Sequence, residues 1–222
     1  LNVVLFNNEI YGLTKGQYSP TSKLGKITKT SPYGTVERPF NPGELVIGAH
    51  GTFFARSIDA EVNLTTECMV AASKHDGLSV IEVLVNCMIF NNGTHKAFAG
   101  DKEVRAEHTI TLRQGEKMLF GKNMDKGLML DNMKLKVVTV GENGVTLDDI
   151  LVHDAHEKDT MVHVMLASMK YPDFPVALGI IRDVAEPTYE REVARQIAEV
   201  QATAKIKNVD DLLNSGETWE VE

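Results

Sequence analysis

The sequence predicts an α/β fold built on a parallel sheet, with a carboxyl-terminal extension. Two observations predict it: apolar segments of strand length alternate with segments of helical composition, and the strand segments are apolar almost throughout. Continuously apolar strands are typical of parallel sheets that helices cover on both faces. The expected strands cover 1–6, 52–58 and 78–85, and the expected helices start at Asn41 and cover 61–74.

The first strand, 1–6, is expected to be buried, and a long irregular loop over 7–40 follows it. Prolines break this loop at Pro20, Pro32 and Pro39. A stretch of this length without regular structure inside a compact domain is usually functional. The next helix is expected to start at Asn41-Pro42, because Asn is a good helix cap and Pro fits the first turn. It ends near 48–51.

Residues 94–156 differ in composition and are rich in Lys, Asp, Gly and Met. A β-hairpin is expected around the turn at 141–144, between strands at 135–140 and 145–147. This region is either a peripheral β extension without chemistry, or a subunit contact or a lid over a site. The predicted domains are therefore 1–98, part of the α/β domain, and 99–222, a carboxyl-terminal extension and subunit-contact region.

A helix over 157–169 and a strand over 176–181 are expected next, before a last helix that starts near Pro187. Apolar residues recur at helical spacing along this last helix, opposite a charged face. They are Tyr189, Val193, Ile197, Val200 and Ala204. Such a helix is expected to pack on its own subunit or on a partner subunit.

Composition excludes some classes of function. The 222-residue chain has 43% hydrophobic residues and a net charge of −8, which argues against general nucleic-acid binding. No apolar run approaches the ~20 residues of a membrane span. The low cysteine content suits a reducing compartment, so a cytoplasmic location is expected. A basic run at Lys23, Lys26 and Lys29 is either solvated surface or a contact for phosphate or coenzyme A.

The polar loop after the first strand carries the chemistry. It offers the amides of Asn7 and Asn8, one cation at Lys15, and several hydroxyls. The hydroxyls belong to Thr14, Ser19, Thr21 and Ser22. Loops at the carboxyl ends of strands are where open α/β sheets bind ligands, and Mg²⁺ prefers oxygen ligands together with phosphate. A metal–diphosphate site is therefore predicted here.

The stretch from Asn7 to Ser22 closely resembles the thiamine-diphosphate loop of the β subunits of 2-oxoacid:ferredoxin oxidoreductases. The resemblance implies that the Asn8 side chain and the Ile10 carbonyl hold Mg²⁺ against the diphosphate, with Tyr11 and Gly12 beside the cofactor. The family has a Gly-Asp-Gly segment before this loop, and this chain has none. We therefore expect an incomplete thiamine-diphosphate-binding fold, the carboxyl-terminal part of a longer subunit.

The segment that starts with Thr14-Lys15 resembles the form found in enzymes that act on 2-oxoglutarate or on a broad set of 2-oxoacids. Pyruvate-directed relatives usually have glycine in place of Lys15. The resemblance implies that Thr14 and Lys15 face the substrate, and that Lys15 pairs with the distal carboxylate of a dicarboxylic 2-oxoacid. A charge-assisted bond of this kind contributes about 1.5–3 kcal/mol.

Two further segments resemble the same family. The segment 85–93 resembles the one that supplies the last cysteine of a [4Fe–4S] cluster, which makes Cys87 the implied ligand; the segment 171–179 matches a Pro-x-Phe-Pro-Val motif. Taken by itself, Cys87 would be interpreted as an ordinary core cysteine. One thiolate cannot hold a cluster that needs four, so this chain alone is expected to be cluster-free. Cys68 lies in a helical segment and is expected to be buried and inert.

The resemblance implies the oxidative decarboxylation of 2-oxoglutarate to succinyl-coenzyme A, with ferredoxin as electron acceptor. It also implies an α subunit as partner, which supplies the acid that activates the aminopyrimidine, so the isolated chain is expected to be inactive. Two alternatives remain: an inert fragment, and a diphosphate-binding module without redox activity. His153 and His156 have a metal-like spacing, but no third ligand follows at a defined distance, and no metal is expected there.

Overall fold

The computed structural model describes residues 1–217 and 219. The chain divides into two compact units, Leu1–Ala185 and Glu186–Glu222. Within the described residues, no helix is long and apolar enough to cross a membrane. The predicted division into a part of the thiamine-diphosphate-binding domain, 1–98, and a carboxyl-terminal extension with subunit contacts, 99–222, stays a prediction. Strands from both regions share one sheet of the first unit.

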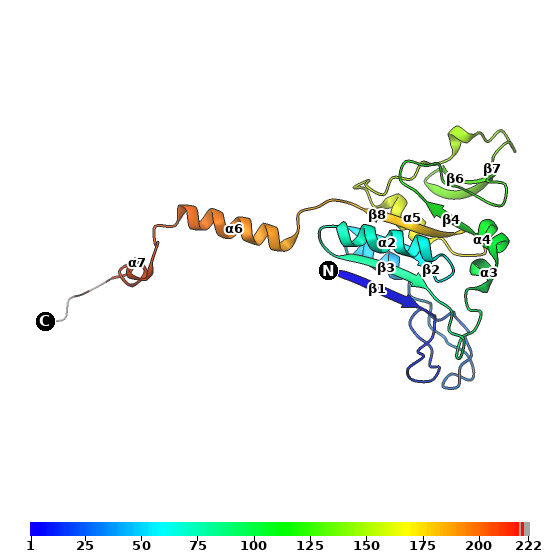
Figure 1. Ribbon diagram of the computed structural model, residues 1–222, viewed down its shortest axis with the longest axis horizontal. Helices are drawn as coiled ribbons and strands as arrows, with labels where there is room; N and C mark the ends of the chain where they lie inside the picture. Colours follow the sequence, from blue (N-terminus) through cyan, green and yellow to red (C-terminus); the bar gives the residue numbers. More distant parts are fainter. Residues whose placement is uncertain (218, 220–222) are drawn as a thin grey trace. The chain divides into compact units, whose positions relative to one another are not determined.

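A five-stranded sheet in the order β1-β3-β2-β8-β4 organises the first unit (Figure 1). Its strands are β1 Asn2–Asn7, β2 Phe53–Ile58, β3 Ser79–Leu84, β4 Thr109–Leu112 and β8 Val176–Asp183. β1, β3 and β2 run parallel, as predicted. β8 runs antiparallel to β2 and parallel to β4, so the sheet is mostly parallel. The predicted α/β fold class is confirmed.

Helices cover both faces of this sheet because the side chains of β2 alternate between them. Phe53 and Ala55 pack in one core cluster with α2, Val62–Lys74, whereas Phe54 packs in the other. The second cluster contains Ile47 of α1, Pro42–Gly48, and Leu166 of α5, Met161–Ser168. The predicted cap of α1 is confirmed, since the Asn41 side chain accepts hydrogen bonds from the amides of Gly43 and Glu44.

The start of α5 differs from the prediction. A helix was expected from 157, but the helix begins at Met161. The Asp159 carboxylate accepts a hydrogen bond from the Met161 amide at 2.7 Å, which satisfies a free amide at the first turn. Residues 157–160 are not helical. Short helices complete the first unit: α3 Lys96–Ala99, α4 Lys102–His108 and the 3₁₀ helix η1 Leu147–Asp149.

The burial predicted for the first strand is wrong. The strand itself is present, but Leu1 is 86% exposed and Phe6 65% exposed. β1 is the edge strand of the sheet and pairs with β3 alone, so its side chains lack neighbours on one side. The apolar run therefore correctly indicated a strand, but it wrongly indicated that the strand is buried.

The predicted hairpin at 141–144 is also wrong. A separate three-stranded sheet is formed by β5 Leu119–Phe120, β6 Lys126–Asp131 and β7 Lys134–Thr139. β7 pairs antiparallel with β6 through a turn at Asn132 and Met133, which have φ of 46° and 62°. A type I′ hairpin turn needs positive φ at both positions, and methionine gives no sequence signal for it. Residues 145–147 are not a strand; a local turn bonds the Gly141 amide to the Val145 carbonyl.

The second unit contains α6, Tyr189–Thr203, and α7, Val209–Leu213. α6 begins where predicted, since Thr188 caps it by accepting a hydrogen bond from the Arg191 amide. Neither helix contains a buried residue. The predicted packing of the apolar face of α6 on its own or a partner subunit stays a prediction.

Candidate functional site

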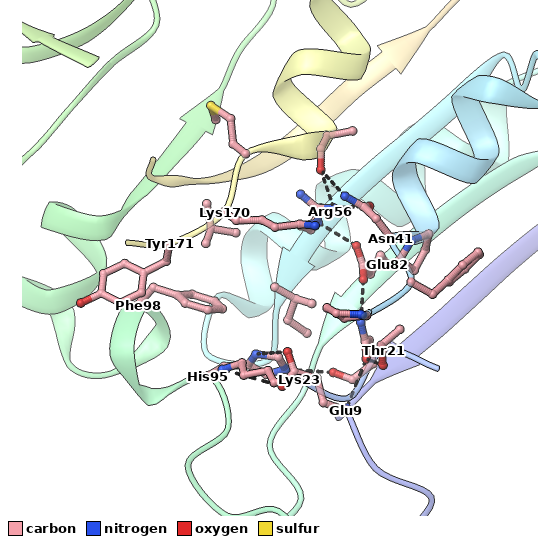
Figure 2. Close-up of a pocket in the computed structure, with 18 of the residues that line it drawn as sticks. Glu9, Thr21, Lys23, Asn41, Arg56, Glu82, His95, Phe98, Lys170 and Tyr171 are labelled. Atoms are coloured by element: carbon pink, nitrogen blue, oxygen red, sulfur yellow. Dashed lines mark hydrogen bonds and ion pairs between the residues drawn. The ribbon is translucent and has the colours of Figure 1, made fainter. Parts of the chain in front are cut away.

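A cavity of about 300 Å³ lies at the carboxyl ends of β1, β3 and β2 (Figure 2). The carboxyl-terminal half of each strand contributes a polar side chain to it: Asn7 from β1, Arg56 from β2 and Glu82 from β3. The remaining lining comes from the polar loop, from Asn41 and Pro42, from Leu84, from 95–98 and from 167–176. Ligands of open α/β sheets bind outside the carboxyl ends of the strands, so this edge is where a site is expected.

Asn7 connects the strand ends with the polar loop. Its side-chain nitrogen donates to Glu82 Oε1 at 2.7 Å, and its side-chain oxygen accepts from Thr21 Oγ1 at 2.7 Å. Its backbone carbonyl accepts from the Val85 amide at 3.0 Å and contacts His95 Nε2 at 3.1 Å. Asn7 is 8% exposed, so these groups replace water as its partners.

Arg56 and Glu82 form a buried ion pair beside Asn7. Arg56 Nε lies 2.7 Å from Glu82 Oε2, with the two side chains 7% and 2% exposed. Arg56 Nη2 also donates to the Ala167 carbonyl at 3.2 Å, which ties the pair to the end of α5. Removal of one partner of such a pair leaves an uncompensated buried charge and costs ~3–5 kcal/mol.

The predicted metal ligands lie at the start of the polar loop. The Asn8 side-chain oxygen accepts from the Ile10 amide at 3.1 Å. Asn8, Ile10 and Tyr11 line a second cavity of about 430 Å³, together with Leu5 and Phe6 of β1. The amide oxygen of Asn8 and the carbonyl oxygen of Ile10 are hard donors of the kind that Mg²⁺ prefers. Two such donors suit an ion that keeps several waters and phosphate oxygens as ligands.

The predicted substrate residues lie on a small closed turn. The Tyr11 amide donates to the Gln17 carbonyl at 2.8 Å, and the Gly16 amide donates to the Tyr11 carbonyl at 2.9 Å. Thr14 and Lys15 are exposed at the tip of this turn, and Gly12 is half-buried. Gly16 has φ of 99°, and a Cβ there would lie 3.1 Å from Phe90, so this position requires glycine.

The structure brings the Cys87 segment against the polar loop. Cys87 starts a turn in which the Asn91 amide donates to the Cys87 carbonyl at 3.0 Å. The Asn91 side chain then donates to the Asn8 carbonyl at 2.9 Å, and Thr94 Oγ1 donates to the Glu9 carboxylate at 2.7 Å. Figure 1 shows both segments extending from the same end of the sheet. The polar loop and the Cys87 segment, which carry the predicted cofactor residues, are therefore hydrogen-bonded to each other.

Two lysines of the predicted basic run take part in this contact. Lys23 donates to the Thr94 carbonyl at 3.2 Å, and Lys26 donates to the Asn91 side chain. Lys29 is exposed. The first two lysines therefore hold loops together, which neither of the two interpretations of the run anticipated.

Arg56, Glu82 and His95 were missed as site residues. His95 is 5% exposed, its Nδ1 has no hydrogen-bond partner among the described residues, and it lies 4.0 Å from Glu9 Oε1. Arg56 and Glu82 did carry a signal: each is a charged residue within an otherwise apolar strand. A charge at such a position is almost never buried without a partner.

The remaining sequence candidates lie elsewhere. Cys68 is buried in α2, and its burial raises the pKa of the thiol to about 11, so the predicted burial is confirmed; its inertness stays a prediction. The buried His163 donates from Nε2 to the Asp154 carbonyl at 2.8 Å, and its Nδ1 accepts from Arg182 Nη1 at 2.9 Å. Among the described residues, no group of three or more His, Cys, Asp or Glu side chains could hold a metal ion.

Fold and sequence agree on the class of this domain. The model of the thiamine pyrophosphate enzyme, C-terminal TPP binding domain, matches residues 1–83, which include the strands and the polar loop that form the cavity edge. Residues 1–83 are thus similar to the thiamine-diphosphate-binding domain of such enzymes.

Comparison with individual proteins narrows this class. Over its whole length the chain is 37% identical to the 2-oxoglutarate oxidoreductase subunit KorB of Mycobacterium tuberculosis, of which it covers 59%. It is 42% identical over 87 residues to the 2-oxoglutarate synthase subunit KorB of Archaeoglobus fulgidus, a match that covers 39% of this chain and 33% of that subunit. The chain thus spans somewhat more than half the length of the relative that it matches throughout.

A solved structure shows the same fold. The 2-oxoglutarate:ferredoxin oxidoreductase from Magnetococcus marinus, solved with 2-oxoglutarate, coenzyme A and succinyl-CoA bound, matches with a TM-score of 0.64 and 21% identity. The match covers 98% of this chain and 58% of that one. The predicted resemblance to the β subunits of 2-oxoacid:ferredoxin oxidoreductases, of the 2-oxoglutarate type, is confirmed.

Proposed function

We propose that this chain acts as part of the β subunit of a 2-oxoacid:ferredoxin oxidoreductase that converts 2-oxoglutarate to succinyl-coenzyme A. The observation that carries the proposal is the 37% identity over the entire chain to a 2-oxoglutarate oxidoreductase subunit. The contact between the polar loop and the Cys87 segment supports it, because that contact joins a diphosphate-binding loop to a candidate cluster ligand.

Asn8 and Ile10 are the proposed magnesium ligands, with Tyr11 and Gly12 beside the cofactor. Their donor atoms suit Mg²⁺, and the hydrogen bond from the Ile10 amide fixes the Asn8 side chain on the same short segment as the Ile10 carbonyl. Thiamine diphosphate, when bound, supplies the electron sink for loss of carbon dioxide. The role of this chain is to hold and orient the diphosphate end of that cofactor.

Lys15 and Thr14 are the proposed substrate-binding residues. Both side chains are exposed on the closed turn of the polar loop. Lys15 forms no ion pair within the part of the chain that the structure describes, so its ammonium group is available to the distal carboxylate of 2-oxoglutarate. A monocarboxylic 2-oxoacid such as pyruvate offers no such group.

Cys87 is the proposed ligand of a [4Fe–4S] cluster that passes electrons to ferredoxin. The chain has two cysteines, and Cys68 is buried with a raised thiol pKa, so the other ligands must come from outside this chain. We also propose that an α subunit completes the catalytic site and that the chain is inactive alone. The low cysteine content supports a cytoplasmic location.

The test is an activity assay of the chain within its complete β subunit, co-expressed with the α subunit. We expect reduction of ferredoxin that depends on 2-oxoglutarate, coenzyme A, thiamine diphosphate and Mg²⁺. Cofactor binding without ferredoxin reduction would instead identify a diphosphate-binding module without redox activity. No binding of thiamine diphosphate by the assembly would identify an inert fragment.

A further inference from the structure

We propose that Glu82, held by Arg56, is a positioning residue for the magnesium-binding loop and acts through the side chain of Asn7. This inference rests on the proposed function, in which the neighbouring residue Asn8 is a metal ligand. It assigns a functional role to charged groups that lie inside the sheet and touch neither the predicted metal ligands nor the predicted substrate residues.

The first step is that each carboxylate oxygen of Glu82 accepts a hydrogen bond from a different residue. Oε1 accepts from the Asn7 side-chain nitrogen at 2.7 Å, and Oε2 accepts from Arg56 Nε at 2.7 Å. Only a carboxylate can accept at both places, because an amide in the same position would present one oxygen and one N–H₂ donor. The negative charge of Glu82 is thus matched to two donors in one buried network (Figure 2).

The second step is that this network fixes the orientation of the Asn7 amide. With its nitrogen facing Glu82, its oxygen faces the opposite way and accepts from Thr21 Oγ1 at 2.7 Å and from the Glu9 amide at 3.2 Å. The flipped amide would place its oxygen against the Glu82 carboxylate and its N–H₂ group against the Glu9 amide. Buried polar groups without partners are costly, so the flipped orientation is excluded.

The third step links Asn7 to the metal ligands. The Asn7 side chain holds the Glu9 amide, and the Asn8 side chain holds the Ile10 amide, so two successive side-chain bonds shape the backbone from Asn7 to Ile10. Arg56 anchors the start of this chain of contacts to the Ala167 carbonyl. Partners behind a metal ligand typically contribute 10–100-fold to metal affinity or activity, by fixing ligand orientation.

A purely structural role makes a different prediction. Buried ion pairs contribute little to stability compared with well-packed apolar residues, so stability alone does not require charge at these positions. If Glu82 positions the loop, the arrangement of donors and acceptors matters more than the charge of any one residue. An exchange of roles between residues 7 and 82 should therefore preserve function.

The experiment is a double-mutant cycle of Glu82→Gln and Asn7→Asp. In Glu82→Gln, one amide oxygen must serve two donors, and in Asn7→Asp two carboxylates face each other. In the double variant, the glutamine nitrogen at position 82 donates to the carboxylate at position 7, so this contact is restored with donor and acceptor exchanged. The glutamine oxygen still accepts from Arg56. Glu67→Gln is the control, because Glu67 forms an exposed ion pair with Arg113 remote from the loop.

Two measurements are made on each variant. In the assembled enzyme, we expect the Mg²⁺ concentration for half-maximal activity to rise about 10-fold or more in each single variant, and to return to within a few-fold of wild type in the double variant. In the chain itself, hydrogen exchange followed by mass spectrometry should show faster exchange over 7–22 in each single variant, with recovery in the double variant. The control should match wild type in both measurements.

Three outcomes would overturn the inference: unchanged exchange over 7–22 in Glu82→Gln, faster exchange with an unchanged Mg²⁺ requirement, or a double variant as impaired as the sum of the single variants. The proposed function fails separately, if the wild-type assembly has no activity that depends on Mg²⁺ and thiamine diphosphate. The exchange data then still decide whether Glu82 holds the loop.

Discussion

The Asn91 side chain donates a hydrogen bond to the backbone carbonyl of Asn8 at 2.9 Å, across 83 positions of sequence. Its oxygen accepts from Lys26 at the same time, so one amide joins three segments of the chain. The turn that begins at Cys87 is held through this residue, since the Asn91 amide closes it. The candidate cluster ligand and the candidate metal ligand are therefore mechanically connected.

Asn91→Asp should destabilise the chain by about 1–3 kcal/mol, because a carboxylate would face the Asn8 and Glu9 carbonyls without a proton to donate. Urea unfolding measures the difference. Asn92→Asp is the matched control: it makes the same charge change next in sequence, at an exposed side chain whose oxygen already acts as acceptor. Equal losses in both variants would refute the role of the Asn91 donor.

Lys15→Gly should reduce kcat/KM for 2-oxoglutarate about 10-fold or more, and kcat/KM for pyruvate much less, because ~1.5–3 kcal/mol of carboxylate pairing is lost. Folding should not suffer, since Lys15 has φ of 68°, a conformation that glycine adopts readily. Steady-state kinetics of the assembled enzyme give the ratio. Lys29→Gly removes the same charge from an exposed position and should leave that ratio unchanged. Equal losses for both substrates in Lys15→Gly would count against carboxylate pairing.

Alkylation should separate the two cysteines. Iodoacetamide should label the half-buried Cys87 long before Cys68, whose thiol is buried with a pKa of about 11 instead of 9.0. Peptide mass spectrometry of the folded chain gives the two rates, and similar rates would contradict the burial of Cys68.

The raised pKa of Cys68 should also make the free energy of unfolding depend on pH. The folded state keeps the Cys68 proton to higher pH than the unfolded state does, so the free energy of unfolding falls as pH rises from 9 to about 11.

His163 should make the chain less stable in acid. Burial, with the nearby Arg182 guanidinium, lowers the pKa of His163 below its usual 6.5. The unfolded state therefore binds a proton that the folded state does not, and the free energy of unfolding falls as pH drops below about 6.5. His163→Gln should reduce this slope, because a glutamine keeps a donor and an acceptor but does not titrate. The exposed residue His50 offers the control His50→Asn, which should keep the wild-type slope.

The elements with strong local signals could be predicted from sequence. Asn41-Pro42 indicated the start of α1, and the apolar runs indicated β2, β3 and β8, because capping and strand burial depend on adjacent residues. β1 was located correctly, but its edge position depends on its neighbours in the sheet. The turn at Asn132-Met133 was missed because Met133 adopts a positive φ without any compositional signal.

The candidate site shows the same division. Asn8, Ile10 and Cys87 could be proposed because short motifs carry them, and the contact between their segments is consistent with that proposal. Arg56 and Glu82 could not be placed, because the sequence shows two isolated charges and not that each neutralises the other at 2.7 Å. Pairing between strands that are distant in sequence is a tertiary property, and local patterns do not specify it.

The unpaired edge of β1 has a practical consequence for work with the purified chain. A strand bonded on one flank presents a row of free amides and carbonyls on the other, and here apolar side chains accompany that row. Such a surface is a template on which a second polypeptide can add in register, which favours aggregation. The chain purified without partner subunits should therefore self-associate as its concentration rises. Light scattering over a concentration series would measure the loss of monomer.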